Sequence, residues 1–281
     1  MIDPVTGGGI GAGLYLAKKT ADGIQYLFGG LGDEAREALR RWGEVRLRNM
    51  GRVVEIAHRK SDYDANPDGA VPMRVGFRIL QDGSYSQEEM VLEYLGGVLA
   101  SSRSVEAPAA DVGNSYVAMI AALADDHLRL HYVLYRSMQF KLHGAEHNLW
   151  DRNEATASLN FFVPNDVLIE TSLLGGEKPI TDDPEELFGA LDWLERDGLI
   201  DIVAAGSLEY FQNALQYLAP RDIIEAMTTG GIITRPTALG ASLYTWAFGK
   251  AGRVNEFFTT ELQDFAISDL LVPDRATLFS R

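Results

Sequence analysis

Apolar residues in this chain recur mostly three and four positions apart, which is the spacing of one face of an α-helix. The clearest case is the segment 86–102, where Ser86 followed by Glu89 predicts a capping box at the helix start. Further helices are predicted on both sides, so residues 72–142 are expected to pack together. The apolar face of the segment consists of Met90, Val91, Tyr94, Leu95, Val98 and Leu99.

A long polar helix is predicted before this region. Asp33 is a suitable N-cap, and residues 34–60 follow as one helix or as a kinked helix pair with Gly43 and Gly51 as the weak points. Two shorter helices are expected after the central segment, at 112–124 and 126–142.

The C-terminal part alternates helices with short strands. An acidic helix, 184–197, begins with a proline and is ended by Gly198. Short β-branched runs predict strands at 199–204 and 232–234, and all strands are expected after residue 195. This order resembles a winged-helix module with inserted helices. The other helices are predicted at 207–219, 220–227 and 238–248, and the segment 254–271 is expected to add Phe257, Phe258, Leu262 and Phe265 to the core that the last helix joins.

The predicted fold class is therefore mainly α: a multi-helix bundle with a C-terminal winged-helix-like module that contains a few short strands. Three parts are expected. They are a glycine-rich N-terminal amphipathic helix (1–30), a helical domain (31–150) and the winged-helix-like domain with its helical insert (151–281).

The N-terminal segment combines glycines with a narrow apolar row. The run GGGIGAG at 7–13 has no preceding strand and no Gly-Lys-Ser/Thr, so it does not fit a nucleotide-binding loop. Lys18, Lys19 and Asp22 interrupt the segment, which is too short to span a bilayer. It can lie on the protein's own core, pair with another copy, or lie in a membrane interface. Its row consists of Ile10, Leu14, Ala17, Ala21, Ile24 and Phe28.

The long helix carries a basic stripe along one side. Four arginines lie within roughly 40° of one another around its axis: Arg41, Arg48, Arg52 and Arg59. Glutamates placed four residues before three of them predict ion pairs within the helix: Glu37–Arg41, Glu44–Arg48 and Glu55–Arg59. The stripe is thus interpreted as a solvated face. Docking onto an acidic surface and nucleic-acid binding are the alternatives.

Three stretches carry a resemblance to a known family. They are residues 30–60 with an R-x-R-N run at 46–49, residues 72–102 with an E-Y-x-x-x-x-L-A-S helix, and a G-L-I element near Ile200 followed by RPTALG at 235–240. On these residues the chain resembles the bacterial abortive-infection alpha (Abi-alpha) family. The resemblance implies a role in anti-phage defence, and it supplies no catalytic residues.

Composition narrows the function classes. The chain has no cysteine, which excludes disulfides, thiolate zinc sites and cysteine nucleophiles. Residues 1–100 carry 12 Lys/Arg and 14 Asp/Glu, whereas residues 101–281 carry 13 and 26. The acidic second part would repel a phosphate backbone, so no specific nucleic-acid partner is expected. No secretory leader is recognised, so a cytoplasmic location is expected, with the inner membrane surface as an alternative.

Two histidine pairs are candidate metal ligands. His143, Glu146 and His147 spell H-x-x-E-H, the inverted zinc-peptidase pattern, which requires a helix to bring both imidazoles to one metal. Gly144 weakens such a helix, so an incidental pair is preferred. His127 and His131, at i and i+4, are interpreted as a partly buried helix face.

The preferred function is a non-enzymatic anti-phage defence protein without a cofactor, which acts through a protein partner or as a homo-oligomer. The alternatives are a zinc-dependent hydrolase using HGAEH and a winged-helix transcriptional regulator. The interaction residues are predicted to be Ile10, Leu14, Ile24, Phe28, Arg41, Arg48, Arg52 and Arg59.

Overall fold

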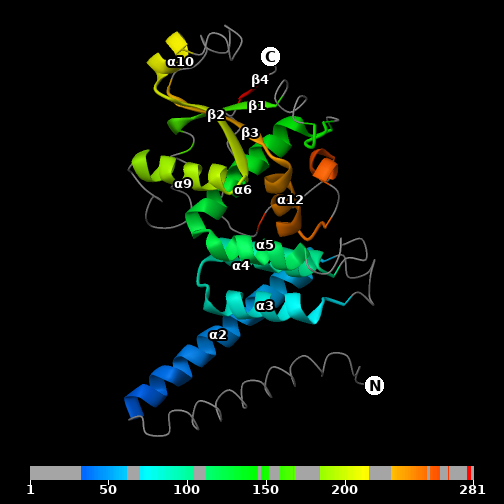
Figure 1. Cartoon of the computed structure of the whole chain (residues 1–281). Helices are drawn as coiled ribbons and strands as arrows, with labels where there is room; N and C mark the ends of the chain where they lie inside the picture. Colours follow the sequence, from blue (N-terminus) through cyan, green and yellow to red (C-terminus); the bar gives the residue numbers. More distant parts are fainter. Residues whose placement is uncertain are drawn as a thin grey trace.

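The computed structural model describes residues 33–61, 70–103, 112–144, 147–151, 159–166, 168, 184–214, 229–251, 254–259, 265 and 277–279. Within these residues the chain is mainly helical, with a small antiparallel sheet at the end of the molecule farthest from the start of α2 (Figure 1). The predicted fold class is confirmed in this respect.

The helices are α2 (Asp33–Lys60), α3 (Met73–Tyr85), α4 (Glu89–Ser101), α5 (Val112–Ala122), α6 (Asp125–Leu142), α9 (Pro184–Arg196), α10 (Leu208–Ala214), α12 (Ala238–Ala247) and the 3-10 helix η2 (Val254–Phe258). The strands are β1 (Asn160–Pro164), β2 (Ile200–Gly206), β3 (Gly231–Pro236) and β4 (Thr277–Phe279).

Helix α4 is the centre of the helical part, where it packs against α2 on one side and α12 on the other. Gly96 faces the side chain of Ile56 in α2, and Gly97 faces the backbone of Ala247 in α12. A Cβ atom at either glycine would overlap those atoms. Glycine weakens a helix by about 1 kcal/mol relative to alanine. The pair is therefore explained by the close approach of three helices.

The start of α4 differs from the prediction. The helix begins at Glu89, and the predicted capping box at Ser86 does not form. Ser86 belongs instead to the turn after α3: its N–H donates to the carbonyl of Gly83, and its own carbonyl accepts from Nδ2 of Asn49 in α2 at 2.5 Å. The contact with α2 thus fixes Ser86 outside the helix.

The long helix α2 is continuous from Asp33 to Lys60, so the single-helix alternative is correct. Its C-terminal half is covered by α3 and α4, with Val53 and Ile56 buried. Its N-terminal half extends beyond these helices (Figure 1). A large part of α2 therefore presents side chains to the surroundings.

Aromatic rings fill the contact between α6 and α12. Tyr135 of α6 lies 5.9 Å from Tyr244 of α12 between ring centroids, and Tyr244 lies 5.6 Å from Phe257. The Tyr135 hydroxyl donates to the carbonyl of Leu199 at 2.5 Å and accepts the N–H of Thr237 at 2.9 Å. These two bonds join α6 to the residues that lead into β2 and α12.

The sheet has the strand order β2-β3-β1-β4, and every neighbouring pair is antiparallel. The predicted strands at 199–204 and 232–234 correspond to β2 and β3. The expectation that all strands follow residue 195 is wrong, because β1 pairs Phe161 with Thr234 and Phe162 with Ile233. Strand β1 is buried on both faces, so its apolar run does not alternate.

The predicted end of the acidic helix is confirmed. Helix α9 ends at Arg196, and Gly198 has φ +71°, a conformation that favours glycine. The N–H of Leu199 donates to the carbonyl of Leu194 at 2.8 Å, which closes the helix in the Schellman manner.

Several predicted elements lie partly outside the described residues. The helix at 1–30 and the inserted helix at 220–227 fall there entirely, while α10 gives the first part of 207–219. Residues 254–258 form a 3-10 helix, and Phe257, Phe258 and Phe265 are buried as predicted. One hydrophobic cluster includes Val53 of α2 and Phe161 of β1, so it crosses the predicted domain boundary at residue 150.

Candidate interaction surface

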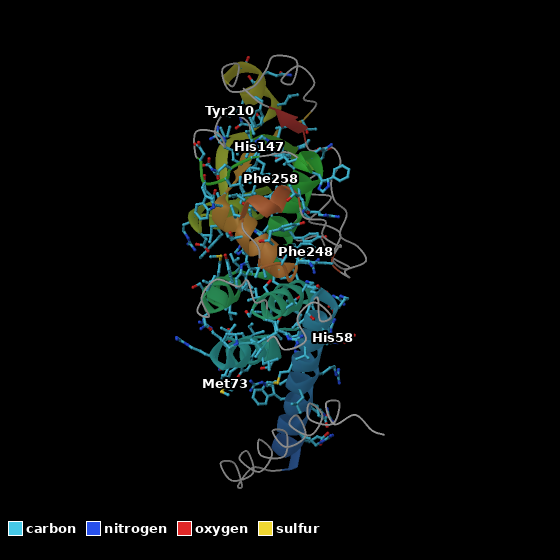
Figure 2. All side chains as sticks on the ribbon, turned by 90° about the vertical axis from the view of Figure 1, so that its right-hand side faces the viewer. His58, Met73, His147, Tyr210, Phe248 and Phe258 are labelled. Atoms are coloured by element: carbon cyan, nitrogen blue, oxygen red, sulfur yellow. The ribbon has the colours of Figure 1, made fainter. Side chains whose placement is uncertain are left out.

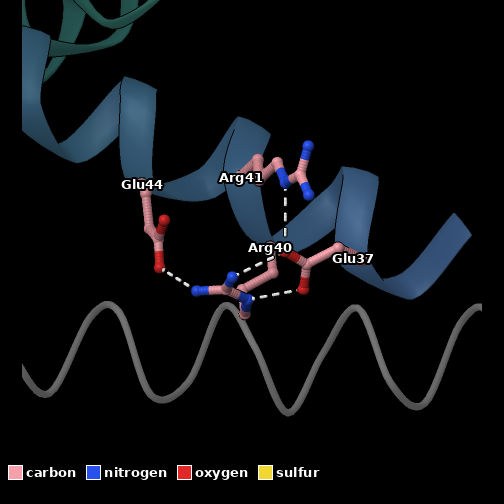
Figure 3. A network of polar contacts seen from close by, with 4 residues as sticks. All are labelled: Glu37, Arg40, Arg41 and Glu44. Atoms are coloured by element: carbon pink, nitrogen blue, oxygen red, sulfur yellow. Dashed lines mark hydrogen bonds and ion pairs between the residues drawn. The ribbon is translucent and has the colours of Figure 1, made fainter. Parts of the chain in front are cut away.

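The N-terminal half of α2 carries a charge network on its surface. Arg40 binds Glu37 at 2.7 Å and Glu44 at 2.5 Å, while Arg41 binds Glu37 at 3.0 Å (Figure 3). The two arginines lower the pKa of Glu37 to about 2. The predicted pair Glu37–Arg41 is confirmed. The predicted pair Glu44–Arg48 is wrong, because Glu44 binds Arg40, and Arg48 is exposed.

The other two arginines of the predicted stripe reach across to α4. Arg52 pairs with Glu89, and Arg59 pairs with Glu93 instead of with the predicted Glu55. Hydrogen bonding to Glu89 raises the pKa of Arg52. The stripe is therefore split: Arg41 and Arg48 face the surroundings, whereas the C-terminal pair holds two helices together.

A buried cation lies at the end of α2. The Lys60 ammonium contacts Oε2 of Glu93 at 2.5 Å and donates to the backbone carbonyls of Glu93 and Ala247 at 2.9 Å each. It also lies 3.9 Å from the ring centroid of Phe265. Burial lowers the pKa of Lys60 to about 8, against the opposing effect of Glu93. These contacts join α2, α4 and α12, and they leave Lys60 no role at the surface.

An exposed aromatic cluster joins α2 and α3. The Arg46 guanidinium lies between two rings, 4.6 Å from the Trp42 centroid and 3.9 Å from that of Tyr85. Its Nη2 and Nε donate to Oγ of Ser84 at 2.8 and 3.0 Å. Sequence reasoning missed this cluster. The spacing of Trp42 and Arg46, four residues apart on one helix, was the available signal, but the ring of Tyr85 comes from another helix.

Helix α3 carries two further exposed apolar side chains. Met73 is 89% exposed and Phe77 71% exposed, four residues apart on the helix, and Met73 lies on the outside in Figure 2. Together with Trp42, Arg46 and Tyr85 they form what is here named the α2–α3 surface. Aromatic residues, methionine and arginine are the types enriched where proteins bind one another.

The HGAEH segment does not have the geometry of the zinc pattern among the described residues. Helix α6 ends at Leu142, before the motif, and Gly144 has φ +81° with its N–H donating to the carbonyl of Phe258. The His147 ring lies 5.5 Å from that of Phe258, edge to face (Figure 2). Glu146 lies outside the described residues. Within the described part, no three His, Cys, Asp or Glu side chains are placed to hold a metal.

The His127–His131 pair has structural contacts. His131 is fully buried; its Nε2 donates to the carbonyl of Gly240 at 3.2 Å, so its Nδ1 accepts from the Tyr94 hydroxyl at 2.6 Å. Burial lowers the pKa of His131 to about 3, although the Gly240 carbonyl opposes this. The Nδ1 of His127 accepts the N–H of Ala124 at the start of α6. The two rings therefore have separate partners.

The exposed side of α9 is occupied by contacts within the chain. Glu195 accepts the N–H of Ile202 at 3.0 Å, and the Arg196 guanidinium lies 3.4 Å from the Trp193 ring centroid. The first contact connects the acidic helix to strand β2, and the second lies within α9.

The predicted interaction residues Ile10, Leu14, Ile24 and Phe28, together with the glycine run at 7–13, lie outside the described residues. No described helix is long and apolar enough to cross a membrane. Comparison with protein-family models, with curated proteins and with solved structures finds no match.

Proposed function

We propose that this protein is a non-enzymatic bacterial anti-phage defence protein of the abortive-infection type, which acts through protein–protein contacts. The observation that carries the proposal is the origin of the α2–α3 surface. Trp42 and Arg46 come from the stretch 30–60, and Met73, Phe77 and Tyr85 come from the stretch 72–102. These are the two longest stretches that resemble the Abi-alpha family.

The other residues of the resemblance support a scaffold for this surface. In the R-x-R-N run, Arg46 binds Ser84 and Asn49 binds the carbonyls of Ser84 and Ser86. In the E-Y-x-x-x-x-L-A-S helix, Glu93 pairs with Arg59, and Ser101 donates to the carbonyl of Trp246. Such residues position helices, which favours a role through surface contacts over one through reacting groups.

The proposed partner is a protein, either a second copy or another component of the infected cell. The location that fits this partner is the cytoplasm, and residues 7–28 are the segment proposed for contact with the inner membrane surface. An exposed side chain such as Phe77 buries little apolar area when the chain folds. Its burial by a partner would remove that area from water, which favours binding.

The test is a phage plaque assay on cells that carry the parent gene, Phe77→Asp or Met73→Asp. A charge on the α2–α3 surface is expected to cost more than about 1 kcal/mol of partner binding and to remove protection. The matched control is Phe140→Asp, which places the same charge on another exposed ring, on α6.

Loss of protection in Phe77→Asp, with an unchanged melting temperature and normal protection in Phe140→Asp, would support the proposal. A parent protein that gives no protection against a broad phage panel would contradict the defence role. Protection by Phe77→Asp and Met73→Asp equal to that by the parent would contradict the assignment of the α2–α3 surface.

A further inference from the structure

The middle of α2 has an exposed apolar strip on a side that α3 and α4 leave uncovered. Leu47 is 41% exposed and Val54 is 50% exposed. Gly43 and Gly51 lie four residues before and four residues after Leu47. A Cβ atom at either glycine would meet no described atom within 4 Å, so there is open space beside both. We name these four residues the α2 strip.

Glycines inside a helix need an explanation, because glycine weakens a helix relative to alanine. In α4, Gly96 and Gly97 are explained by their close contacts with α2 and α12. Gly43 and Gly51 have no such contact with the described residues. A second helix on the α2 strip would supply it, because the distance between packed helices depends on the size of the side chains at their contact.

Two charged side chains beside the strip form no ion pair with the described residues. Arg48 and Glu55 are exposed, and the i,i+4 partners predicted for them are bound by other residues. They are seven residues apart, so they lie within about 20° of one another around α2. A surface with one unpaired charge of each sign can complement a copy of itself, as the contact of a two-fold dimer requires.

We infer that a second copy of this chain binds the α2 strip, with the two α2 helices antiparallel and the two-fold axis at Leu47. This residue lies near the middle of α2, which runs from Asp33 to Lys60, so the two helices overlap along their whole length. The half of α2 that extends beyond α3 and α4 in one copy then lies along the covered half of α2 in the other (Figure 1).

The apolar positions match in this arrangement. Each residue faces the one that lies equally far from Leu47 in the opposite direction. Gly43 of one copy therefore faces Gly51 of the other, and Leu47 meets Leu47 at the axis. Val54 faces Arg40, whose methylene groups can cover it. The two pairs of glycines let the backbones approach on both sides of the central leucines.

The charges match in the same arrangement. Glu44, Arg48 and Glu55 lie on one flank of the strip, within about 40° of one another, and equal flanks meet in an antiparallel two-fold pair. Glu44 of one copy is then displaced by two residues, about 3 Å, from Arg48 of the other. Arg40 is displaced by one residue, about 1.5 Å, from Glu55. Arg40 contacts only Oε1 of Glu44 within the chain, which leaves Oε2 for Arg48 of the second copy.

The pairing leaves the α2–α3 surface uncovered. Trp42 is five residues from Leu47, which places it about 140° away around α2. The dimer therefore presents two α2–α3 surfaces to a partner, which would strengthen binding to a target with two sites. The pairing itself does not depend on the proposed function.

Cysteine cross-linking tests the position of the axis, because the chain has no cysteine of its own. The variant is Leu47→Cys in the full chain. The matched control is Val45→Cys, since Val45 is 36% exposed but points about 160° away from Leu47 around α2. A disulfide forms only where Cα atoms come within about 7 Å, so mild oxidation should join two copies at position 47 at least about tenfold faster than at position 45.

A charge exchange between two variants tests the flanking pairs. Arg48→Glu and Glu44→Arg each place like charges at both of the Glu44–Arg48 contacts. In sedimentation equilibrium each variant alone should dimerise roughly tenfold more weakly than the parent. An equal mixture of the two should dimerise as the parent does, because opposite charges meet again in the mixed pair. Restoration by mixing cannot come from a contact within one chain.

Three results would overturn the pairing. They are a parent that stays monomeric up to about 0.1 mM, where only very weak contacts remain undetected; equal rates of cross-linking at positions 45 and 47; and a mixture that dimerises no better than either variant alone. These measurements need no phage, so they are decided separately from the plaque assay.

Discussion

The α2–α4 contact and the α6–α12 contact each bury an ionisable side chain. The first keeps Lys60 charged, and the second keeps His131 neutral. Lys60 has a pKa of about 8 and stays mostly protonated near pH 7, because the Glu93 carboxylate lies 2.5 Å away. His131 has a pKa of about 3 and stays neutral, because its neighbours are a hydroxyl and a carbonyl. Burial acts on both groups in the same direction, and only the first contact supplies a counter-charge.

This difference indicates what each contact depends on. The α2–α4 contact fails when a charge loses its partner, since an isolated buried charge is costly. The α6–α12 contact fails when a proton is added, since a charged imidazole would have no partner there. The two contacts should therefore respond to different mutations and to different pH ranges.

The largest expected effect is that of Glu93→Gln. The substitution removes the counter-charge of Lys60 and the partner of Arg59, and should lower the free energy of unfolding by about 3 kcal/mol at pH 7. Denaturant titration measures the change. Adding Lys60→Met should recover part of the loss, because the buried charge is then absent.

The loss in Glu93→Gln should also depend on pH. Without the carboxylate the pKa of Lys60 falls below about 8, while the unfolded lysine titrates near 10.5. In the variant the folded lysine loses its proton at a lower pH than in the parent, while the unfolded lysine still holds it. The stability of the variant should therefore rise more steeply than that of the parent between pH 7 and 8. A gap between variant and parent that stays constant across this interval would contradict the buried pair.

A medium effect is expected from acid at His131. The folded pKa of about 3 lies below the unfolded value of 6.5, so the unfolded chain binds the extra proton between these values. Stability is complete above pH 6.5 and should fall by about 2 kcal/mol between pH 6.5 and 5. His131→Gln should remove this slope, since an amide can donate to Gly240 and accept from Tyr94. His127→Gln on the same helix is the control, and equal slopes in both variants would refute the assignment.

Local sequence patterns predict an element correctly where the contacts that determine it lie within that element. The proline at the start of α9 and Gly198 beyond its end both act within one helix, and the structure agrees with both. Spacing also predicted α2 and α4 as helices, since their apolar faces recur with the helical period.

Distant partners account for the errors. The i,i+4 spacing predicts Glu55 as the partner of Arg59, but the buried carboxylate of Glu93 on another helix binds it instead. Strand β1 was missed because the run Phe161–Val163 has no alternation and its partner β3 lies about 70 residues away. The α2–α3 surface likewise depends on Tyr85 meeting Arg46 across two helices. No spacing within one helix reveals such a meeting.

The smallest effect is expected at Arg52, which belongs to the same α2–α4 contact as Glu93 but lies at its surface. The Arg52 and Glu89 side chains are 40% and 45% exposed, so water and salt screen their attraction. Arg52→Met should lower the free energy of unfolding by about 0.2–1 kcal/mol, and the difference should shrink further in 1 M salt, where the Debye length is about 3 Å. Denaturant titrations of both proteins at low and high salt measure this. The stem of the methionine keeps most of the packing of the arginine methylenes, so the comparison isolates the charge.

A loss as large as that of Glu93→Gln would mean that the whole row of cross-helix pairs acts as one buried network. A small, salt-sensitive loss would place the stability of the α2–α4 contact at Lys60 and Glu93, where the charges are removed from water.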